Sequence, residues 1–251
     1  MILIVGLINH LESGNANMTN NLLQIKFKER LNKLASMDYD NIECWQVQEA
    51  FNKAQIEWVR RMLHGLTQKK ENPEQSINMI DNLQILLVDV PFTTLAKRPT
   101  YYETPEIPSN YLHFIRVAAS AINDCCPKRP LTMYLGEEAN VEALLGDSYK
   151  SPNFEWAESF CTIIGNKIRI YTDGKFDIED ARLVYYRKPK DVGFKNCANI
   201  NTGGSYSGDE ECELKDDIIE IIIDEAVAIL AGDIADTNNY QRSLANSTRN
   251  S

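Results

Sequence analysis

The strongest constraint on the fold is a change of hydrophobic pattern along the 251-residue chain. Near both ends, apolar residues recur three or four positions apart, which is the spacing of an amphipathic helix. Between about residues 95 and 189, seven prolines separate short segments rich in Tyr, Thr, Val and Ile, which is typical of strands. The pattern predicts an α+β protein, with a helical bundle from the N-terminal and C-terminal segments and an inserted strand-rich domain.

Helical spacing predicts three helices in the first third of the chain, over residues 20–36, 41–64 and 76–90. The middle helix has two apolar stripes on different sides, and the main one, which includes Phe51, serves the protein core. The second stripe consists of Trp45, Ile56, Val59 and Leu63. Because a second stripe needs a second partner, we expect these four residues to face a neighbouring subunit or the inserted domain.

The strand-rich part is expected to contain at least four strands. Its clearest signal is a hairpin, in which residues 167–171 and 183–187 pair on either side of the turn residues Asp173 and Gly174. Residues 131–135 read as a strand followed by a short helix over 137–145, and residues 111–121 fit a strand or a helix.

These patterns predict the domain organisation. Residues 1–18 are a leader without an assigned role, residues 19–94 the first part of the bundle, residues 95–190 the strand-rich insertion, residues 191–211 a Gly- and Ser-rich linker, residues 212–232 the last bundle helix, and residues 233–251 an extended or mobile tail.

The last predicted helix, over residues 214–231, has a broad apolar side and an acidic side. The acidic side consists of Glu213, Asp216, Asp217, Glu220 and Asp224. Residues 209–225 hold nine acids and one base, so most of the formal net charge of −10 is local. Such a stripe indicates an exposed surface that has a function, and the alternative is a solvated helix face without one.

Composition and motifs argue against several functions. The net charge of −10 disfavours tight nucleic-acid binding, and the longest apolar run, residues 1–8, is far shorter than the roughly 20 residues that span a bilayer. The glycines at 203 and 208 have the spacing of a phosphate-binding loop, but Asp209 and Glu210 follow them and would repel phosphate.

No catalytic residue, metal site or cofactor is predicted. The chain has three histidines and no Gly-x-Ser-x-Gly motif. Its six cysteines include no Cys-x-x-Cys pair and are expected to be reduced thiols in an intracellular protein.

Several long segments are similar to a known family. They include LASMDYDNIECW at 34–45, EAFNKAQIEWVRR at 49–61, FEWAE at 154–158, GNKIRIY at 165–171, YYRKP at 185–189, CELKDD at 212–217 and AGD at 231–233. Over about residues 20–243 the chain resembles a virion structural protein of crAss-like tailed bacteriophages. None of these segments is a catalytic signature.

The resemblance implies a head-to-tail adaptor in the phage neck, assembled in the host cytoplasm, and not an enzyme. Its copies would form a dodecameric ring beneath the portal protein, continue the DNA channel into the tail, and contact the next ring or tail protein. DNA would pass without specific binding, and no membrane would be involved. The tail residues Tyr240, Arg242 and Leu244 are expected to dock on the portal or the next ring, and the acidic side of the last helix is expected to lie on water or line the channel.

Three alternatives remain at this point. One is an intracellular enzyme with its active site in the strand-rich domain, which would show a concave pocket with perturbed ionisable groups. The second is another ring or tail component of the virion. The third, a nucleic-acid-binding module, is opposed by the charge.

Overall fold

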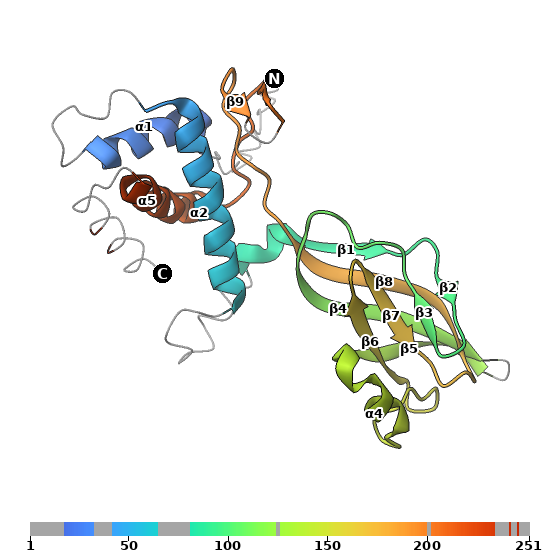
Figure 1. Ribbon diagram of the computed structural model, residues 1–251. Helices are drawn as coiled ribbons and strands as arrows, with labels where there is room; N and C mark the ends of the chain where they lie inside the picture. The colour runs from blue at the N-terminus through green and yellow to red at the C-terminus, as the bar shows by residue number, and fades with distance from the viewer. Residues whose placement is uncertain are drawn as a thin grey trace, which may run out of the picture. The chain divides into compact units, whose positions relative to one another are not determined.

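A computed structural model describes residues 18–32, 42–64, 81–123, 126–199 and 202–233, together with the single positions 241 and 245. The chain divides into two compact units (Figure 1). The terminal unit contains the described residues up to Arg61 and from Lys190 onward. The central unit runs from Met62 to Pro189.

Three helices build most of the terminal unit: α1 (Asn20–Asn32), α2 (Cys44–His64), whose last residues from Met62 belong to the central unit, and α5 (Asp216–Asp233). Thr19 caps α1, since its hydroxyl accepts a hydrogen bond from the Leu22 amide at 3.4 Å. Helix α1 packs along α5. The core takes its side chains from the predicted helical stripes, among them Leu23, Phe27, Leu31, Phe51, Ala54, Trp58, Ile219 and Ile222.

Most of the rest of the terminal unit is the segment 190–212, of which residues 191–211 were predicted to be a linker. It contains the two-stranded ribbon of β9 (Ala198–Asn199) and β10 (Gly204–Ser205), and it buries Val192, Phe194 and Tyr206. Gly193 allows this packing, because a Cβ atom at its position would overlap the Tyr206 ring. The Gly and Ser residues therefore belong to a folded segment.

The central unit is a curled mixed sheet of eight strands in the order β1-β8-β4-β5-β6-β7-β3-β2 (Figure 1). The strands are β1 (Leu87–Pro91), β2 (Ala96–Lys97), β3 (Tyr101–Glu103), β4 (Tyr111–Asn123), β5 (Cys126–Leu135), β6 (Glu158–Ile164), β7 (Lys167–Tyr171) and β8 (Asp177–Arg187). All neighbours pair antiparallel except β5 and β6. That parallel pair is joined by a crossover with η2 (Glu138–Asn140) and α4 (Val141–Gly146), and η1 (Gln84–Leu86) precedes β1.

The sheet buries one continuous apolar core. Its members include Tyr102, Val117, Ala121, Ile168, Ile170, Phe176, Leu183 and Tyr185. The long strands β4 and β8 change register at three points along their pairing, and such bulges bend a sheet. This bending agrees with the curled form of the sheet.

The predicted fold class, a helical bundle carrying an inserted domain, is wrong. The dominant element is the eight-stranded sheet, and helices are few among the described residues. Part of the error lies in the helix predicted over 76–90, of which only residues 81–90 are described. Leu87–Pro91 is strand β1, paired with β8, because the β-branched Val88 and Val90 fit a strand ladder although the leucines before them also fit a helix.

The predicted hairpin is also wrong. Strand β7 pairs with β6 and β3, whereas β8 pairs with β1 and β4. Asp173 and Gly174 do form a turn, in which the Asp173 carboxylate accepts the Lys175 amide at 2.9 Å, but this turn leads to a different part of the sheet. The true hairpin joins β6 and β7 through Gly165, whose φ of +58° suits a tight hairpin turn.

Other local expectations are confirmed. Residues 111–121, which fitted a strand or a helix, lie in β4, and the strand and short helix expected from 131 to 145 correspond to β5 and α4. Among the described residues, no helix is long and apolar enough to cross a membrane.

Candidate interaction surfaces

The described residues contain no group of three or more His, Cys, Asp or Glu side chains that could hold a metal ion. Burial raises the pKa of Cys161 to about 12 and that of Cys212 to about 12, so these thiols stay protonated at neutral pH and are poor nucleophiles. The candidate functional sites are therefore exposed surfaces, together with the contacts that hold them in place.

The four residues predicted to face a partner do not form one surface. Val59 is fully buried within the chain and belongs to its core. Ile56 and Leu63 are half-buried, and Trp45 is 38% exposed at the start of α2. The exposed part of this stripe is therefore centred on Trp45.

A polar stripe on α2 was missed by the sequence analysis. It consists of Gln48, Asn52 and Gln55, which we call the amide clasp because their side chains bind the backbone of segment 190–194. The Asn52 amide donates to the Val192 carbonyl at 3.1 Å and accepts the Val192 amide at 2.8 Å. Gln55 donates to the Lys190 carbonyl at 2.9 Å, and Gln48 accepts the Phe194 amide at 3.3 Å.

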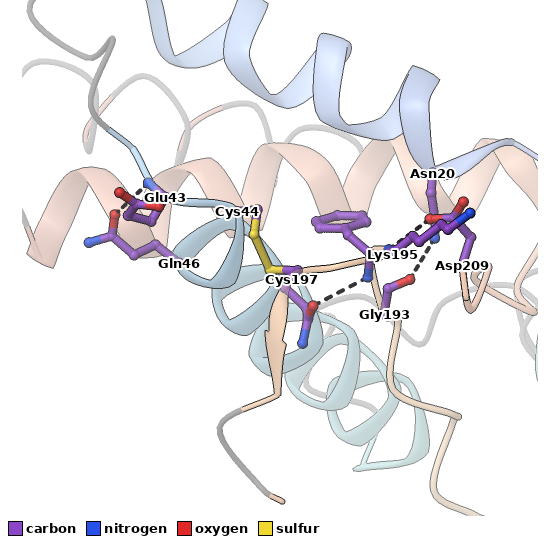
Figure 2. The surroundings of a disulfide bond; sticks show 10 residues. Asn20, Glu43, Cys44, Gln46, Gly193, Lys195, Cys197 and Asp209 are labelled. Carbon is purple, nitrogen blue, oxygen red and sulfur yellow. Dashed lines mark hydrogen bonds between the residues drawn. A yellow bond between two sulfur atoms is a disulfide. The ribbon is translucent and has the colours of Figure 1, made fainter. Parts of the chain in front are cut away.

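Helix α1 adds a further bond to the same segment. The Asn20 side chain donates to the carbonyl oxygen of Gly193 at 2.8 Å (Figure 2). It also donates to the carbonyl oxygen of Glu210 at 3.2 Å. Amides at helical spacing among apolar stripes are the sequence signal for such a clasp. That signal does not identify the segment that is bound.

Cys44 and Cys197 form a disulfide bond, with Cα atoms 5.9 Å apart (Figure 2). The expectation that all six cysteines are reduced is therefore wrong for this pair. The two cysteines are 153 positions apart, and sequence spacing gives no sign that the fold brings them together. The bond joins the first residue of α2 to the segment held by the amide clasp.

The five acidic residues of α5 and its approach have different environments. Asp217 is exposed. The Asp216 carboxylate accepts the Met18 amide at 2.8 Å, and Glu213 accepts the Lys190 amide at 3.0 Å. Glu220 forms ion pairs with Lys26 and Arg30, and Asp224 pairs with Arg30 at 3.0 Å.

The ion pairs between α1 and α5 set the charge state of Glu220. Partial burial works to raise the pKa of this carboxyl, but the hydrogen bonds and charges of Lys26 and Arg30 outweigh it and hold the pKa below its ordinary value. Two of the five acidic residues, Glu220 and Asp224, thus pair with basic residues of α1 in the same chain. Asp217 is the member most clearly open to solvent.

A second exposed surface lies in the central unit, on residues 147–157, which we call the aromatic loop. Tyr149 is 79% exposed and Trp156 is 54% exposed, and their rings stack with centroids 6.4 Å apart. The sequence analysis missed this pair, although a Trp and a Tyr in a turn-rich segment are a recognisable signal.

Local bonds fix the aromatic loop. The Asp147 carboxylate accepts the Tyr149 amide at 2.9 Å, and the Asn153 side chain accepts the Trp156 amide at 3.1 Å. Ala157 has a φ of +55°, which is unfavourable for a residue with a Cβ. The loop therefore presents its two rings in a preformed conformation.

The predicted docking residues Tyr240, Arg242 and Leu244 lie outside the described residues. No protein-family model matches the chain, and no curated protein matches it significantly.

Proposed function

We propose that the protein is a structural protein of a tailed-phage virion, a head-to-tail adaptor whose copies form a ring beneath the portal. The ring, dodecameric by the family resemblance, continues the DNA channel into the tail and holds the tail in place. Its partners are further copies of itself, the portal protein and the next ring or tail protein. It is assembled in the host cytoplasm, acts in the neck of the virion, needs no cofactor and catalyses no reaction.

The observation that carries this proposal is the presence of two different exposed aromatic surfaces. One is centred on Trp45 in the terminal unit, and the other is the Tyr149–Trp156 pair in the central unit. A ring contact is heterologous, so each subunit needs two different patches, one for each neighbour. Exposed Trp and Tyr side chains are enriched at the energetic centres of protein interfaces.

The aromatic loop suits such a contact for a second reason. The backbone amides of Tyr149 and Trp156 donate hydrogen bonds to the side chains of Asp147 and Asn153, so the loop loses little conformational freedom when a partner binds. We assign this surface to the neighbouring copy in the ring.

Imaging tests the function. Purified protein at high concentration should form rings in negative stain, and a gold label on the chain should appear at the neck of intact particles. A label along the tail or on the capsid shell would contradict the adaptor assignment, as would particles that lack the protein.

Trp156→Ala tests the aromatic surface. We expect this substitution to reduce the formation of oligomeric rings at least tenfold without changing the melting temperature. The Trp156 side chain is exposed and contributes little to the stability of the folded monomer. Lys150→Ala is the matched control in the same loop and should leave assembly unchanged. Equal ring formation by the unmodified protein, Trp156→Ala and Lys150→Ala would contradict a subunit contact at the aromatic loop.

A further inference from the structure

Segment 190–212 is attached to the helices of its unit in an unusual way. Its described residues form a short ribbon of β9 and β10, with two residues in each strand, and one further backbone bridge between Gly193 and Glu210. Its attachments to the rest of the unit include the bonds of the amide clasp and of Asn20, the burial of apolar side chains, and the Cys44–Cys197 bond. A segment held by few backbone ladders opens more easily than a helix or a large sheet.

The disulfide is the covalent part of this attachment, and its two cysteines differ in exposure. Cys197 is 1% exposed, whereas Cys44 is half-buried at the start of α2 (Figure 2). A small thiol or disulfide in solution therefore reaches the Cys44 sulfur more readily. Access is one of the factors that decide which sulfur takes part in exchange.

We propose that the Cys44–Cys197 bond is a thiol–disulfide exchange site that locks segment 190–212 onto α2. Its reaction partner is a low-molecular-weight disulfide of the glutathione class. In the reduced chain only hydrogen bonds and packing hold the segment, among them the amide clasp and the bonds of Asn20, and in the oxidised chain the attachment is also covalent.

The chemistry balances in two steps. The Cys44 thiolate attacks one sulfur of glutathione disulfide, which forms a mixed disulfide on Cys44 and releases one glutathione. The Cys197 thiol loses its proton and attacks the Cys44 sulfur, which forms the Cys44–Cys197 bond and releases the second glutathione. Two electrons and two protons pass from the protein to the glutathione disulfide.

Cys212, the last residue of this segment, provides an internal control. The Cys212 thiol donates a hydrogen bond to the Gln55 side chain at 3.2 Å, and burial raises its pKa to about 12. Cys212 is therefore inert to exchange at neutral pH.

The timing of locking rests on the proposed function, whereas the exchange site does not. A reducing cytoplasm keeps the two thiols reduced while particles assemble, and oxidising surroundings close the bond after release. The lock then acts after the segment has reached its final place.

The first experiment uses the purified full-length chain in a series of glutathione and glutathione-disulfide mixtures. Alkylation and mass spectrometry measure the state of each cysteine, and hydrogen exchange measures the amides of Val192, Phe194 and Tyr206. We expect these amides to exchange at least tenfold faster after reduction, while α5 amides change less than twofold. A bond that does not form in excess glutathione disulfide, or equal exchange in both states, would overturn the proposal.

Two variants sharpen the result. In the Cys197→Ser variant, the amides of Val192, Phe194 and Tyr206 should exchange hydrogen rapidly in every glutathione mixture. In the Cys212→Ser variant, their hydrogen exchange should depend on the mixture as it does in the unmodified chain. The reductant series on the unmodified chain needs neither variant, so the proposal stays testable if one of them fails to fold.

Virions test the timing separately. Particles trapped with an alkylating reagent inside cells should carry reduced Cys44 and Cys197, and released particles should carry the bond. The same state in both samples would overturn the timing. Virions that lack the protein would instead contradict the proposed function, and the exchange measured on the purified chain would stand.

Discussion

Arg61, near the end of α2, forms an ion pair with Glu225 in the middle of α5. Glu225 is only 6% exposed, and its second carboxylate oxygen has no hydrogen-bond partner within the described residues. Burial raises the pKa of Glu225 above its ordinary value, although the charge of Arg61 works in the opposite direction. The ion pair therefore links α2 to α5, and removal of Arg61 would leave the buried Glu225 carboxylate without its partner.

Arg61→Ala should destabilise the protein by about 3 kcal/mol near neutral pH, because it leaves a buried carboxylate unpaired. The folded-state pKa of Glu225 lies above the unfolded value, so its contribution to stability is greatest below the unfolded pKa and is lost as pH rises through the folded pKa. In the variant that folded pKa rises further. The destabilisation should therefore be smaller at about pH 5 than at about pH 8.

Urea unfolding at both pH values measures this difference, and Arg60→Ala is the matched control. Arg60 is exposed, so its removal should change the free energy of unfolding by less than about 0.5 kcal/mol. A destabilisation by Arg61→Ala that is independent of pH would show that Glu225 is not the group left unpaired.

Phe51→Ala should cost about 3 to 5 kcal/mol in the free energy of unfolding, because it opens a cavity in a packed core. Phe51 is fully buried, as its helical stripe predicts. Lys53→Ala, two positions further along α2 on an exposed site, is the control. Thermal or urea unfolding measures both, and an unchanged midpoint for Phe51→Ala would remove Phe51 from the core.

The helices could be predicted where one apolar stripe decided the structure. Leu23 and Phe27 in α1 and Phe51 in α2 lie where helical periodicity places them. Residues 87–91 were assigned incorrectly because a short apolar run fits both helical and strand periods. These residues form a strand because they pair with β8, which is distant in the sequence.

The pairing partners of the strands and several side-chain contacts could not be predicted either, because they join residues that are distant in the sequence. The Asp173–Gly174 turn is local and was recognised, but the neighbours of β7 and β8 are set by the whole sheet. The Cys44–Cys197 bond joins positions 153 apart. Glu220 and Asp224 were expected to lie on water or line the channel, and their ion pairs were missed because a helix wheel does not show that Arg30 of another helix lies against them.

Deletion of residues 236–251 should leave the fold intact and abolish incorporation into particles. This prediction treats the tail, with Tyr240, Arg242 and Leu244, as the segment that docks on the portal or the next ring. Docking by the tail of one subunit is weak, but many copies in a ring restore affinity. Circular dichroism and particle composition measure the two effects, and normal incorporation of the truncated chain would contradict the docking role.

The acidic side of α5 is predicted to face water or the DNA path, and Asp217 is the residue that tests this. Glu220→Lys is unsuitable, because it breaks the ion pairs with Lys26 and Arg30 and should destabilise the contact between α1 and α5. That variant serves as the control for a structural effect. Asp217 is exposed, so Asp217→Lys should leave the melting temperature within about 2 °C of the unmodified protein.

In the channel account, Asp217 repels the phosphates of passing DNA and keeps the polymer from adhering to the wall. Asp217→Lys replaces repulsion with attraction, so particles should assemble normally and eject DNA more slowly, with a delay that shrinks as salt is raised because screening weakens the attraction. In the competing account, basic residues of a neighbouring ring pair with this surface, and the same variant should then fail to assemble. Time-resolved DNA release from purified particles separates the two accounts, and normal assembly with unchanged ejection would show that Asp217 lies away from both the channel and the neighbouring ring.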